Sequence, residues 1–555
     1  MKINSRLLLI LTFVFFSLTT FGQIKQRERP KSWDSLIFGG RFMDRFLPMP
    51  IQGTLTYDTW GAKNVIPRYI DNGIEDNINS YWGGKAVLGK DSKYHLFVCG
   101  WPENAPKGHM YWPNSTVFHA VSNNSFGPYK IKDTVGPGHN PEVFQLHDGK
   151  YVIYAIDRYY ISNSFDDPWE EKKFQFNKRD RNIIEGLSNL TFAKREDGSF
   201  LMVCRGGGIW FSKTGISPYN QVTEKRVYPP VEGEFEDPLV WRTNIQYHMI
   251  VNDWLGRIAF SLRSKDGVNW KVDPGEAYAP GISKYEDGTN EDWFKYERIK
   301  VLQDKYGRAT QAHFAVIDTI KWNDLENDNH SSKHIIIPLT VGKLATVLNK
   351  KKITAKTKTI KVKIEAEKGF NPHTDIDFNS LKFGATEQVN FGRGSKVVKT
   401  EKSRNDIIIT FQGKDNGLTD DNFAAKIIGK TTEGKLLFAY TRLPEVNYIE
   451  PILSARMPKI TKSAEGYDIH VDIENFGQTA SQVSQVELVY LNNNTETFVA
   501  SAKIPKLEPF DKTTIHLKYD GKLFSGKETL PIKVIINPKS KNPPVLHGNI
   551  SISKP

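Results

Sequence analysis

Short apolar runs separated by polar turns recur along the first 340 residues of the chain and predict strand–turn–strand segments. In the clearest case, apolar residues at 142–145 and 151–154 flank Asp148-Gly149, and Asp-Gly between apolar runs is a strong hairpin signal. The same order recurs in five segments, at residues 85–98, 142–154, 190–203, 239–251 and 299–316. Repeated hairpins of one construction indicate an all-β unit with internal repeats.

A third apolar element follows at least four of these hairpins and is itself followed by a turn and an aromatic residue. Examples are residues 118–122 before Gly127-Pro128-Tyr129 and residues 160–164 before Asp167-Pro168-Trp169. The repeats are spaced by roughly 45 to 60 residues, close to the roughly 40–50 residues of a propeller blade. We therefore predict a five-bladed β-propeller over residues 35–345, which would be the catalytic domain.

The pattern changes after residue 345. Alternating strands such as residues 360–364 and 406–411 continue without the repeat, and Glu450-Pro451 resembles a short linker. We expect two β-sandwich domains of about 100 residues each, one over residues 346–449 and an immunoglobulin-like one over residues 450–555.

The first 22 residues have the organisation of a secretory signal peptide. A basic start precedes an apolar core at residues 7–18, and small residues follow near a cleavage point. The apolar core is too short for a membrane span, so the mature protein is expected to be exported, either periplasmic or secreted. Cys99 and Cys204 lie inside apolar strand-like runs and are expected to be buried free thiols.

Composition narrows the class of partner. Hydrophobic residues make up 39% of the chain, aromatic residues 12%, and the formal net charge is +12. In an exported protein such a charge favours an acidic polysaccharide over nucleic acid, since no nucleic-acid motif is visible. No Cys/His spacing typical of a metal site occurs, so we expect no metal and no cofactor.

Candidate functional residues gather where the hairpins begin and end, because both ends of a hairpin lie on one side. Aligning the five hairpin starts gives two columns of equivalent positions. One contains Trp82, His139, Ser188, Glu236 and Glu297, and the next contains Gly83, Asn140, Asn189, Asp237 and Arg298. Since successive strand residues point to opposite faces, alternation predicts that only one column faces the central axis at a given height.

Further candidates lie near the same rim. The returning strands end at Asp157-Arg158 and at Arg205, His313 lies within the fifth returning strand, and Asp58 precedes the first hairpin. Aromatic, Arg and Asn side chains beside paired acids suit a saccharide site. The expected substrate-binding residues are Trp82, Asn140, Arg158, Asn189, Arg205, Asp237, Glu297, Arg298 and His313.

Several of the candidates also have a purely structural interpretation. Asp237 precedes a proline and can be a turn former, and Glu297-Arg298 can be an ion pair that braces the last repeat. His139 can be a packing histidine, and His313 can point into the channel or into the core. Asp58 can enter the central funnel or cap a loop.

Third strands that contain Ser and are followed by Gly-Pro-Tyr or Asp-Pro-Trp resemble those of the five-bladed propeller glycoside hydrolases, the superfamily of arabinanases, β-xylosidases and anhydrogalactosidases. The resemblance covers residues 35 to 345. It implies an acid Glu, for which Glu236 is the candidate, and an Asp that tunes it, either Asp157 or Asp237. It also implies a base on the first blade, where Trp82-Gly83-Gly84 has no acid, so Asp58 is the candidate base.

Two other functions stay open at this stage. A uronate-specific lyase or dehydratase removes a proton next to a carboxylate and forms an unsaturated uronic acid, which requires a base and groups that neutralise the carboxylate. His139 would be the catalytic residue, and the supporting set would be Asn140, Asn189, Arg158, Arg205 and Arg298. A non-catalytic glycan-binding protein is the remaining possibility. In all three cases the partner is an anionic poly- or oligosaccharide, with no nucleic acid and no membrane span.

Overall fold

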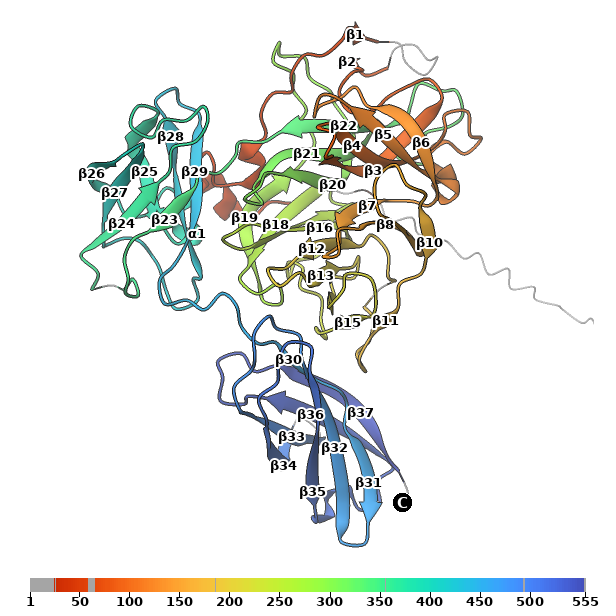
Figure 1. Ribbon diagram of the computed structural model, residues 1–555, viewed down its shortest axis with the longest axis vertical. Helices are drawn as coiled ribbons and strands as arrows, with labels where there is room; N and C mark the ends of the chain where they lie inside the picture. Colours follow the sequence, from red (N-terminus) through yellow and green to blue (C-terminus); the bar gives the residue numbers. More distant parts are fainter. Residues whose placement is uncertain are drawn as a thin grey trace, which may run out of the picture.

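The computed structural model describes residue 24 and residues 26–57, 65–184, 186–354, 356–492 and 495–553. Nearly every regular element in these residues is a strand, with one short α-helix, α1 (Thr386–Val389), and a few 3₁₀ turns (Figure 1). The predicted all-β class is therefore confirmed. The predicted signal peptide at residues 1–22 and the candidate base Asp58 lie outside the described residues. No helix in the described part of the chain is long and apolar enough to cross a membrane.

In the described residues, a two-stranded sheet of β1 (Leu55–Thr56) and β2 (Arg68–Tyr69) precedes five larger consecutive sheets, each of which contains one of the predicted hairpins. Most are antiparallel meanders in which sequence order equals spatial order. The first consists of β3 (Asn79–Leu88), β4 (Tyr94–Pro102), β5 (Thr116–Ser122) and β6 (Lys130–Pro137). The second consists of β7 (Glu142–Gln145), β8 (Tyr151–Ala155), β9 (Arg158–Ser162) and β10 (Glu170–Lys172). The third consists of β12 (Thr191–Lys194), β13 (Phe200–Val203), β14 (Ile209–Ser212) and β15 (Tyr219–Gln221), with β11 (Phe176–Asn177) parallel at its edge.

The fourth and fifth sheets follow the same plan. The fourth consists of β16 (Phe235–Arg242), β17 (Tyr247–Asp253), β18 (Ile258–Ser264) and β19 (Trp270–Tyr278), and the fifth of β20 (Lys295–Gln303), β21 (Ala309–Ile317) and β22 (Ser332–Pro338). The fifth sheet has three strands, and the N-terminal segment extends it through the bridges Phe46↔Leu339 and Ile74↔His334. An early segment thus pairs with the last sheet.

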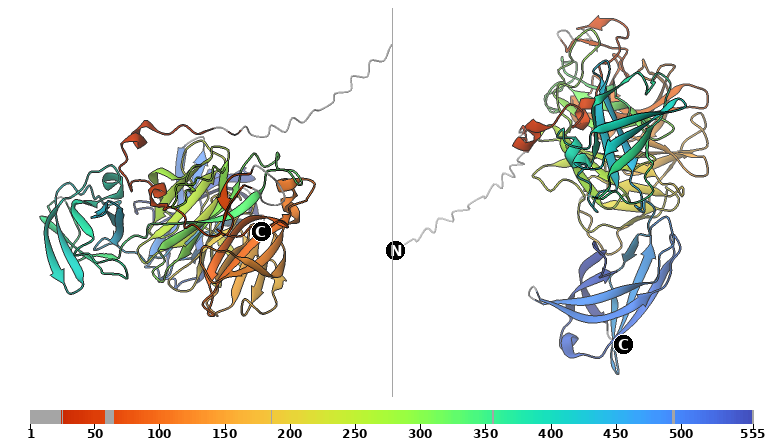
Figure 2. Two further views of the ribbon diagram at one scale, coloured as in Figure 1. Left: turned by 90° about the horizontal axis from the view of Figure 1, so that it is seen from above. Right: turned by 90° about the vertical axis from the view of Figure 1, so that its left-hand side faces the viewer.

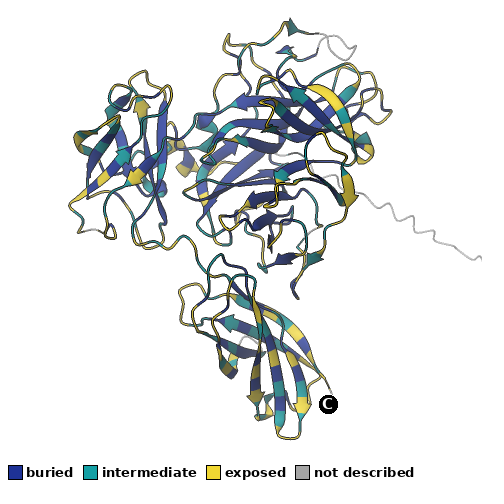
Figure 3. Cartoon of the chain, in the orientation of Figure 1, coloured by how far each residue is buried: buried dark blue, intermediate teal, exposed yellow. Residues whose placement is uncertain are grey.

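The first strands of the five sheets contact one another in a closed cycle, from β3 to β7, β12, β16, β20 and back to β3. We call this arrangement the ring of five sheets, and the line through its centre the axis. Most residues of these strands are buried, as the dark blue ribbon in Figure 3 shows, and their side chains form hydrophobic clusters shared by neighbouring sheets. Cys99 and Cys204 are both buried and free, as the sequence predicts.

A β-bulge changes the side-chain alternation near the start of β16. Between the pairs Glu236↔Asn252 and Leu239↔Ile250, two residues of β16 lie opposite one residue of β17, and Asp237 has a φ of +54°. The equivalent residue in each of the other four sheets also has a positive φ between +52° and +62°: Gly83, Asn140, Asn189 and Arg298. Because a bulge adds one residue to a strand, the prediction that alternation keeps Glu236 and Asp237 on opposite faces is wrong here, and carboxylate oxygens of both belong to one cluster.

Two smaller units follow, each with its own hydrophobic core, and lie on separate sides of the ring (Figures 1 and 2). The middle unit has two sheets, one of β23 (Ala345–Val347), β24 (Thr359–Ile364), β27 (Asp406–Gln412) and β26 (Val397–Ser403), the other of β25 (Ile376–Gly384), β28 (Ala424–Thr431) and β29 (Leu436–Arg442). The C-terminal unit consists of β30 (Leu453–Ala455), β31 (Lys459–Ser463), β32 (Gly466–Asn475), β33 (Ser484–Asn492), β34 (Thr495–Ile504), β35 (Lys512–Tyr519), β36 (Thr529–Ile536) and β37 (Val545–Ser553).

Charged and polar contacts attach both units to the ring. On the middle unit, Glu387 of α1 lies 3.3 Å from Arg263 of β18, and Lys426 donates from Nζ to the carbonyl of Gly39 in the N-terminal segment at 2.8 Å. On the C-terminal unit, Glu474 pairs with Arg179 at 2.6 Å. The two units therefore contact the outside of the ring rather than its axis.

Candidate functional site

Four of the five residues with positive φ at the hairpin starts bond to one another around the axis. The Asn140 amide donates to Asn189 Oδ1 at 2.9 Å, and the Asn189 amide donates to Asp237 Oδ1 at 2.9 Å. Arg298 Nη1 also donates to Asp237 Oδ1, at 3.0 Å, and its Nη2 reaches the Asn140 carbonyl at 3.5 Å. At the fifth position, a Cβ on Gly83 would lie 3.5 Å from Asn140 Oδ1. We call this set the axial network.

The axial network uses four residues that the sequence predicts as substrate-binding. Asn140, Asn189, Asp237 and Arg298 are all buried, with exposed fractions of 2% to 6%. Burial of polar groups is costly unless they are hydrogen-bonded, and here the partners come from neighbouring sheets. The structure shows that these residues link neighbouring sheets around the axis. Their contact with a substrate stays a prediction.

Three carboxylates meet directly beside the axial network. Oxygen atoms of Glu236, Asp237 and Glu297 lie within 4.8 Å of one another. The bulge in β16 brings the first two together, and β20 of the next sheet supplies the third. Like charges this close cannot all be ionised without compensation, so the partners of each carboxylate decide its state.

Glu236 is the member of the cluster that holds a proton. Burial, and then repulsion from Asp237 and Glu297, raises the pKa of Glu236 to about 8, against the smaller opposing effects of Lys321 and Arg205. The Arg205 guanidinium lies 3.3 Å from Glu236 Oε2 and is 38% exposed. Glu236 is therefore protonated at neutral pH and lies next to a cation that solvent can reach.

Glu297 is ionised because two ammonium groups face its carboxylate. Lys321 Nζ donates to Glu297 Oε2 at 2.5 Å, and Lys295 Nζ lies 3.6 Å from Oε1. Burial alone would raise the pKa of Glu297, but Lys321 and Lys295 outweigh burial and lower it below its ordinary value. The cluster thus contains one proton donor and one carboxylate.

The composition of the cluster also bears on metal binding. Three carboxylate ligands within such a distance can in principle hold a cation. Here both oxygens of Glu297 already face the ammonium groups of Lys321 and Lys295, and Glu236 is protonated at neutral pH. This donor set fits acid–base chemistry better than a cation site.

Aromatic side chains border the cluster. The Trp82 ring, predicted at the site, lies 4.9 Å from Lys321 Nζ and packs edge-on against His109. Trp254, partly exposed, lies 4.7 Å from Lys295 Nζ. Aromatic side chains with a few placed polar groups are typical of sites that bind small molecules.

Sequence reasoning missed Lys295, Lys321, His109 and Trp254. Lys295 and Trp254 adjoin predicted positions, because Lys295 is two residues before Glu297 and Trp254 follows the end of β17. Lys321 lies in the irregular segment between β21 and β22, where no periodic pattern marks it. Lys321 is recognised as a site residue only because the folded chain places its Nζ beside Glu297.

His139 is buried among aromatic rings. Its Nδ1 lies 2.9 Å from Ser115 Oγ, and its ring lies 4.8 Å from the Trp112 ring. Burial, and then the charges of Arg298 and Lys321, lowers the pKa of His139 well below its ordinary value. His139 is therefore a neutral imidazole at neutral pH, and its predicted catalytic role stays a prediction.

The remaining predicted residues are not members of the carboxylate cluster. Arg158 pairs with Glu171 at 3.0 Å on the two outer strands of the second sheet. Asp157 occupies the turn before β9 with a φ of +71°, so Asp237, whose charge acts on Glu236, is the better candidate for the tuning acid. His313 is fully buried in β21, with its ring 5.4 Å from that of His334.

Comparisons with known proteins leave the activity open. No protein-family profile matches the chain, and no curated protein matches it. Among solved structures, it is similar to an endo-arabinase from Bacteroides thetaiotaomicron, with a TM-score of 0.30 and 11% identity over 47% of this chain and 94% of that chain. An α-L-arabinofuranosidase from Lactobacillus brevis gives 0.33 and 12% over 47% and 91%, and a glycoside hydrolase gives 0.34 and 11% over 84% and 97%. The structural neighbours thus include glycoside hydrolases, but likeness at this level does not assign an activity.

Proposed function

We propose that this protein is a carbohydrate-active enzyme, a glycoside hydrolase that breaks down acidic polysaccharide or its oligosaccharides. We also infer that the ring of five sheets is a five-bladed β-propeller and that the two following units are β-sandwich domains, the last one immunoglobulin-like. The closed cycle of first strands supports the propeller. The apolar run at residues 7–18 supports export to the periplasm or the medium.

The observation that carries the proposal is the opposite ionisation of two neighbouring glutamates. The pKa of Glu236 is raised to about 8, and that of Glu297 is lowered. Glycosidases use a protonated carboxylic acid and an ionised carboxylate on either side of the scissile bond. Environments that push the pKa values of two nearby acids apart are the usual sign of such a division of labour.

The geometry supports a reaction in two steps. Glu236 gives its proton to the glycosidic oxygen while Glu297 attacks the anomeric carbon, so that the glycosidic bond breaks and a glycosyl ester forms. Water then attacks the ester, and ionised Glu236 takes the proton from that water, which restores both residues. Carboxyl groups about 5–5.5 Å apart are typical of this retaining route, whereas inverting enzymes need about 6.5–9.5 Å. One oxygen of Glu236 and one of Glu297 lie within 4.8 Å of each other, which favours the shorter separation.

Cations at the site support an acidic substrate. Arg205 is 38% exposed beside Glu236, and Lys321 is 20% exposed beside Glu297. A guanidinium presents several donors in one plane and binds carboxylates well. The net charge of +12 adds a long-range attraction for polyanions.

Elimination is the alternative, and His139 is the observation in its favour. A neutral imidazole can act as the base that removes a proton next to a uronate carboxylate. Against it, Asn140, Asn189 and Arg298, the groups needed to neutralise that carboxylate, are bonded within the axial network. We therefore favour hydrolysis, with lyase action and non-catalytic glycan binding as the competing outcomes of one assay.

The test is incubation with acidic oligosaccharides, followed by reducing-sugar and ultraviolet-absorbance measurements on the same samples. Hydrolysis releases reducing ends without absorbance, and elimination produces an unsaturated uronate that absorbs. We expect the first result, and we expect Glu236→Gln to remove it. Glu234→Gln, an exposed glutamate two positions away, is the matched control and should retain activity. Absorbance that depends on His139 would favour the lyase, and binding without any product would reject both catalytic functions.

A further inference from the structure

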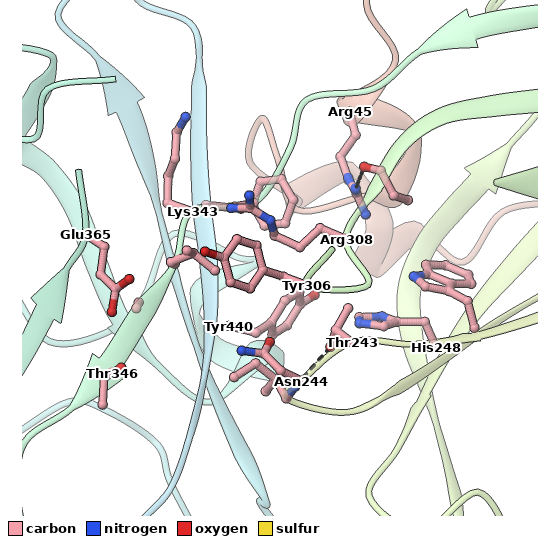
Figure 4. A pocket seen from close by; sticks show the side chains of 17 residues that line it. Arg45, Thr243, Asn244, His248, Tyr306, Arg308, Lys343, Thr346, Glu365 and Tyr440 are labelled. Atoms are coloured by element: carbon pink, nitrogen blue, oxygen red, sulfur yellow. Dashed lines mark hydrogen bonds between the residues drawn. The ribbon is translucent and has the colours of Figure 1, made fainter. Parts of the chain in front are cut away.

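A cavity lies between the outside of the ring and the middle unit. It has a volume of about 200 Å³. Side chains from the fourth and fifth sheets, from the 3₁₀ turn η2 (Phe42–Arg45) and from β29 line it (Figure 4). None of the carboxylate cluster or of the axial network contributes to its walls, so it is distinct from the proposed active site.

Arg45 contributes a buried charge to this cavity. Its guanidinium is over the rings of Phe42 and Phe438, at 4.5 and 4.8 Å, and donates to the carbonyls of Thr340 and Ala309 at 3.3 and 3.4 Å. These are its contacts within the described part of the chain, and none is a carboxylate. A buried cation with only neutral partners is costly, and an anion in the cavity would supply the missing charge.

Other charges of the cavity wall do not cancel Arg45. Arg308 is held by Asp304 and Glu367, each at 2.7 Å, and Glu365 is held by Lys363 at 2.9 Å. Lys343 lies with Nζ 4.1 Å from the Phe370 ring. The wall therefore has a positive balance.

Aromatic rings provide the remaining surface. Trp241 stacks on His248 at 4.8 Å, His248 meets Tyr440 edge-on, and Tyr306 faces the same space from the turn between β20 and β21 (Figure 4). Sites for drug-sized ligands have volumes of about 300–1,000 Å³, so a cavity of about 200 Å³ suits a smaller molecule. Flat rings and one guanidinium match a single sugar ring that carries a carboxylate.

We propose that this cavity is a binding site for a monosaccharide acid, with Arg45 pairing with the carboxylate and Tyr306 and Trp241 packing against the sugar ring. Because residues of the ring and of the middle unit both form the walls, the ligand contacts the two together. Binding at this site is independent of catalysis at the axis.

Calorimetric titration of the full chain with glucuronate, glucose and acetate tests the proposal. Glucuronate should bind, and glucose, which lacks the carboxylate, and acetate, which lacks the ring, should each bind at least about tenfold more weakly. Arg45→Met and Tyr306→Ala should each weaken glucuronate binding about tenfold or more. The same loss should appear in an Arg205→Met background, which lacks the cation beside Glu236 and so separates this cavity from the axial site.

Arg195→Met is the matched control. Arg195 is also a buried guanidinium over a ring, Phe211 at 4.4 Å, and donates to a carbonyl, that of Phe476 at 2.8 Å, but it faces the C-terminal unit. The Arg195→Met variant should bind glucuronate with the same affinity as the unchanged protein. Should Arg45→Met fail to fold, Tyr306→Ala decides the question alone. Unchanged binding in that variant, an equal loss in Arg195→Met, or equal affinity for glucose or acetate would overturn the proposal.

Discussion

Glu236 and Glu297 have carboxylate oxygens within 4.8 Å of each other, yet their pKa values are displaced in opposite directions. The difference arises from their neighbours. Two lysines face Glu297, whereas Glu236 is next to Asp237 and has one partly exposed arginine. The roles of acid and carboxylate are thus assigned by the surrounding charges and not by the residue type.

Activity should decline above about pH 8. Glu236 must be protonated to donate, and it loses its proton as the pH rises through its pKa of about 8. Glu297 must be ionised, and its lowered pKa places the acidic limit of activity below the ordinary glutamate value of about 4.3. The pH profile of kcat/KM measures both limits. In Asp237→Asn, which removes a negative charge beside Glu236, the basic limit should move to lower pH, and an unchanged limit would exclude Asp237 as the tuning residue.

Lys321→Met should move the acidic limit of activity to higher pH. Removing the ammonium group at 2.5 Å from Glu297 removes the largest influence that lowers its pKa. Burial then raises the pKa of Glu297, so that its carboxylate is ionised only at a higher pH. Lys265→Met is the control, because Lys265 is also 20% exposed and ion-paired, but with Glu450 away from the axis. A lower kcat without any shift of the limit would contradict this role of Lys321.

The sugar released should retain its anomeric configuration. A gap within 4.8 Å between carboxylate oxygens leaves little room for the water that an inverting enzyme places between acid and base. Proton NMR during the first minutes of hydrolysis distinguishes the anomers before they interconvert. Release of the inverted anomer would show that Glu297 activates water instead of attacking the sugar.

Glu142→Gln should destabilise the ring of five sheets by about 3–5 kcal/mol, as expected when one partner of a buried ion pair is removed. Glu142 is 1% exposed and pairs with Lys300 and, at 3.4 Å, with Lys85. The change leaves the buried ammonium group of Lys300 and the partly exposed one of Lys85 without their carboxylate. Urea unfolding measures the loss, and Glu171→Gln, which breaks the exposed pair with Arg158, should cost about 0–1 kcal/mol. Equal effects of the two changes would contradict the expectation.

The sequence predicts the hairpins of the ring well because Asp-Gly turns and apolar runs are local features. It also identifies Glu236, Asp237 and Glu297, because equivalent hairpin starts must meet at one end. Side-chain alternation fails at Asp237, since a bulge depends on the packing of strand starts around the axis and not on the local pattern. Lys321 could not be found, because an irregular segment carries it to Glu297.

The axial network has a consequence for how the protein folds. Arg298 and Asn140 are 158 residues apart in sequence. The hydrogen bond between them can form only after the sheets between them have folded and packed around the axis. Folds dominated by contacts of such long sequence separation form slowly, because the chain loses loop-closure entropy before the contacts stabilise it. The carboxylate cluster adjoins this network, so a chain with an unfinished ring has no acid beside a carboxylate. Recovery of activity during refolding should therefore lag behind the formation of strands. Activity would appear only in chains whose ring of five sheets is complete.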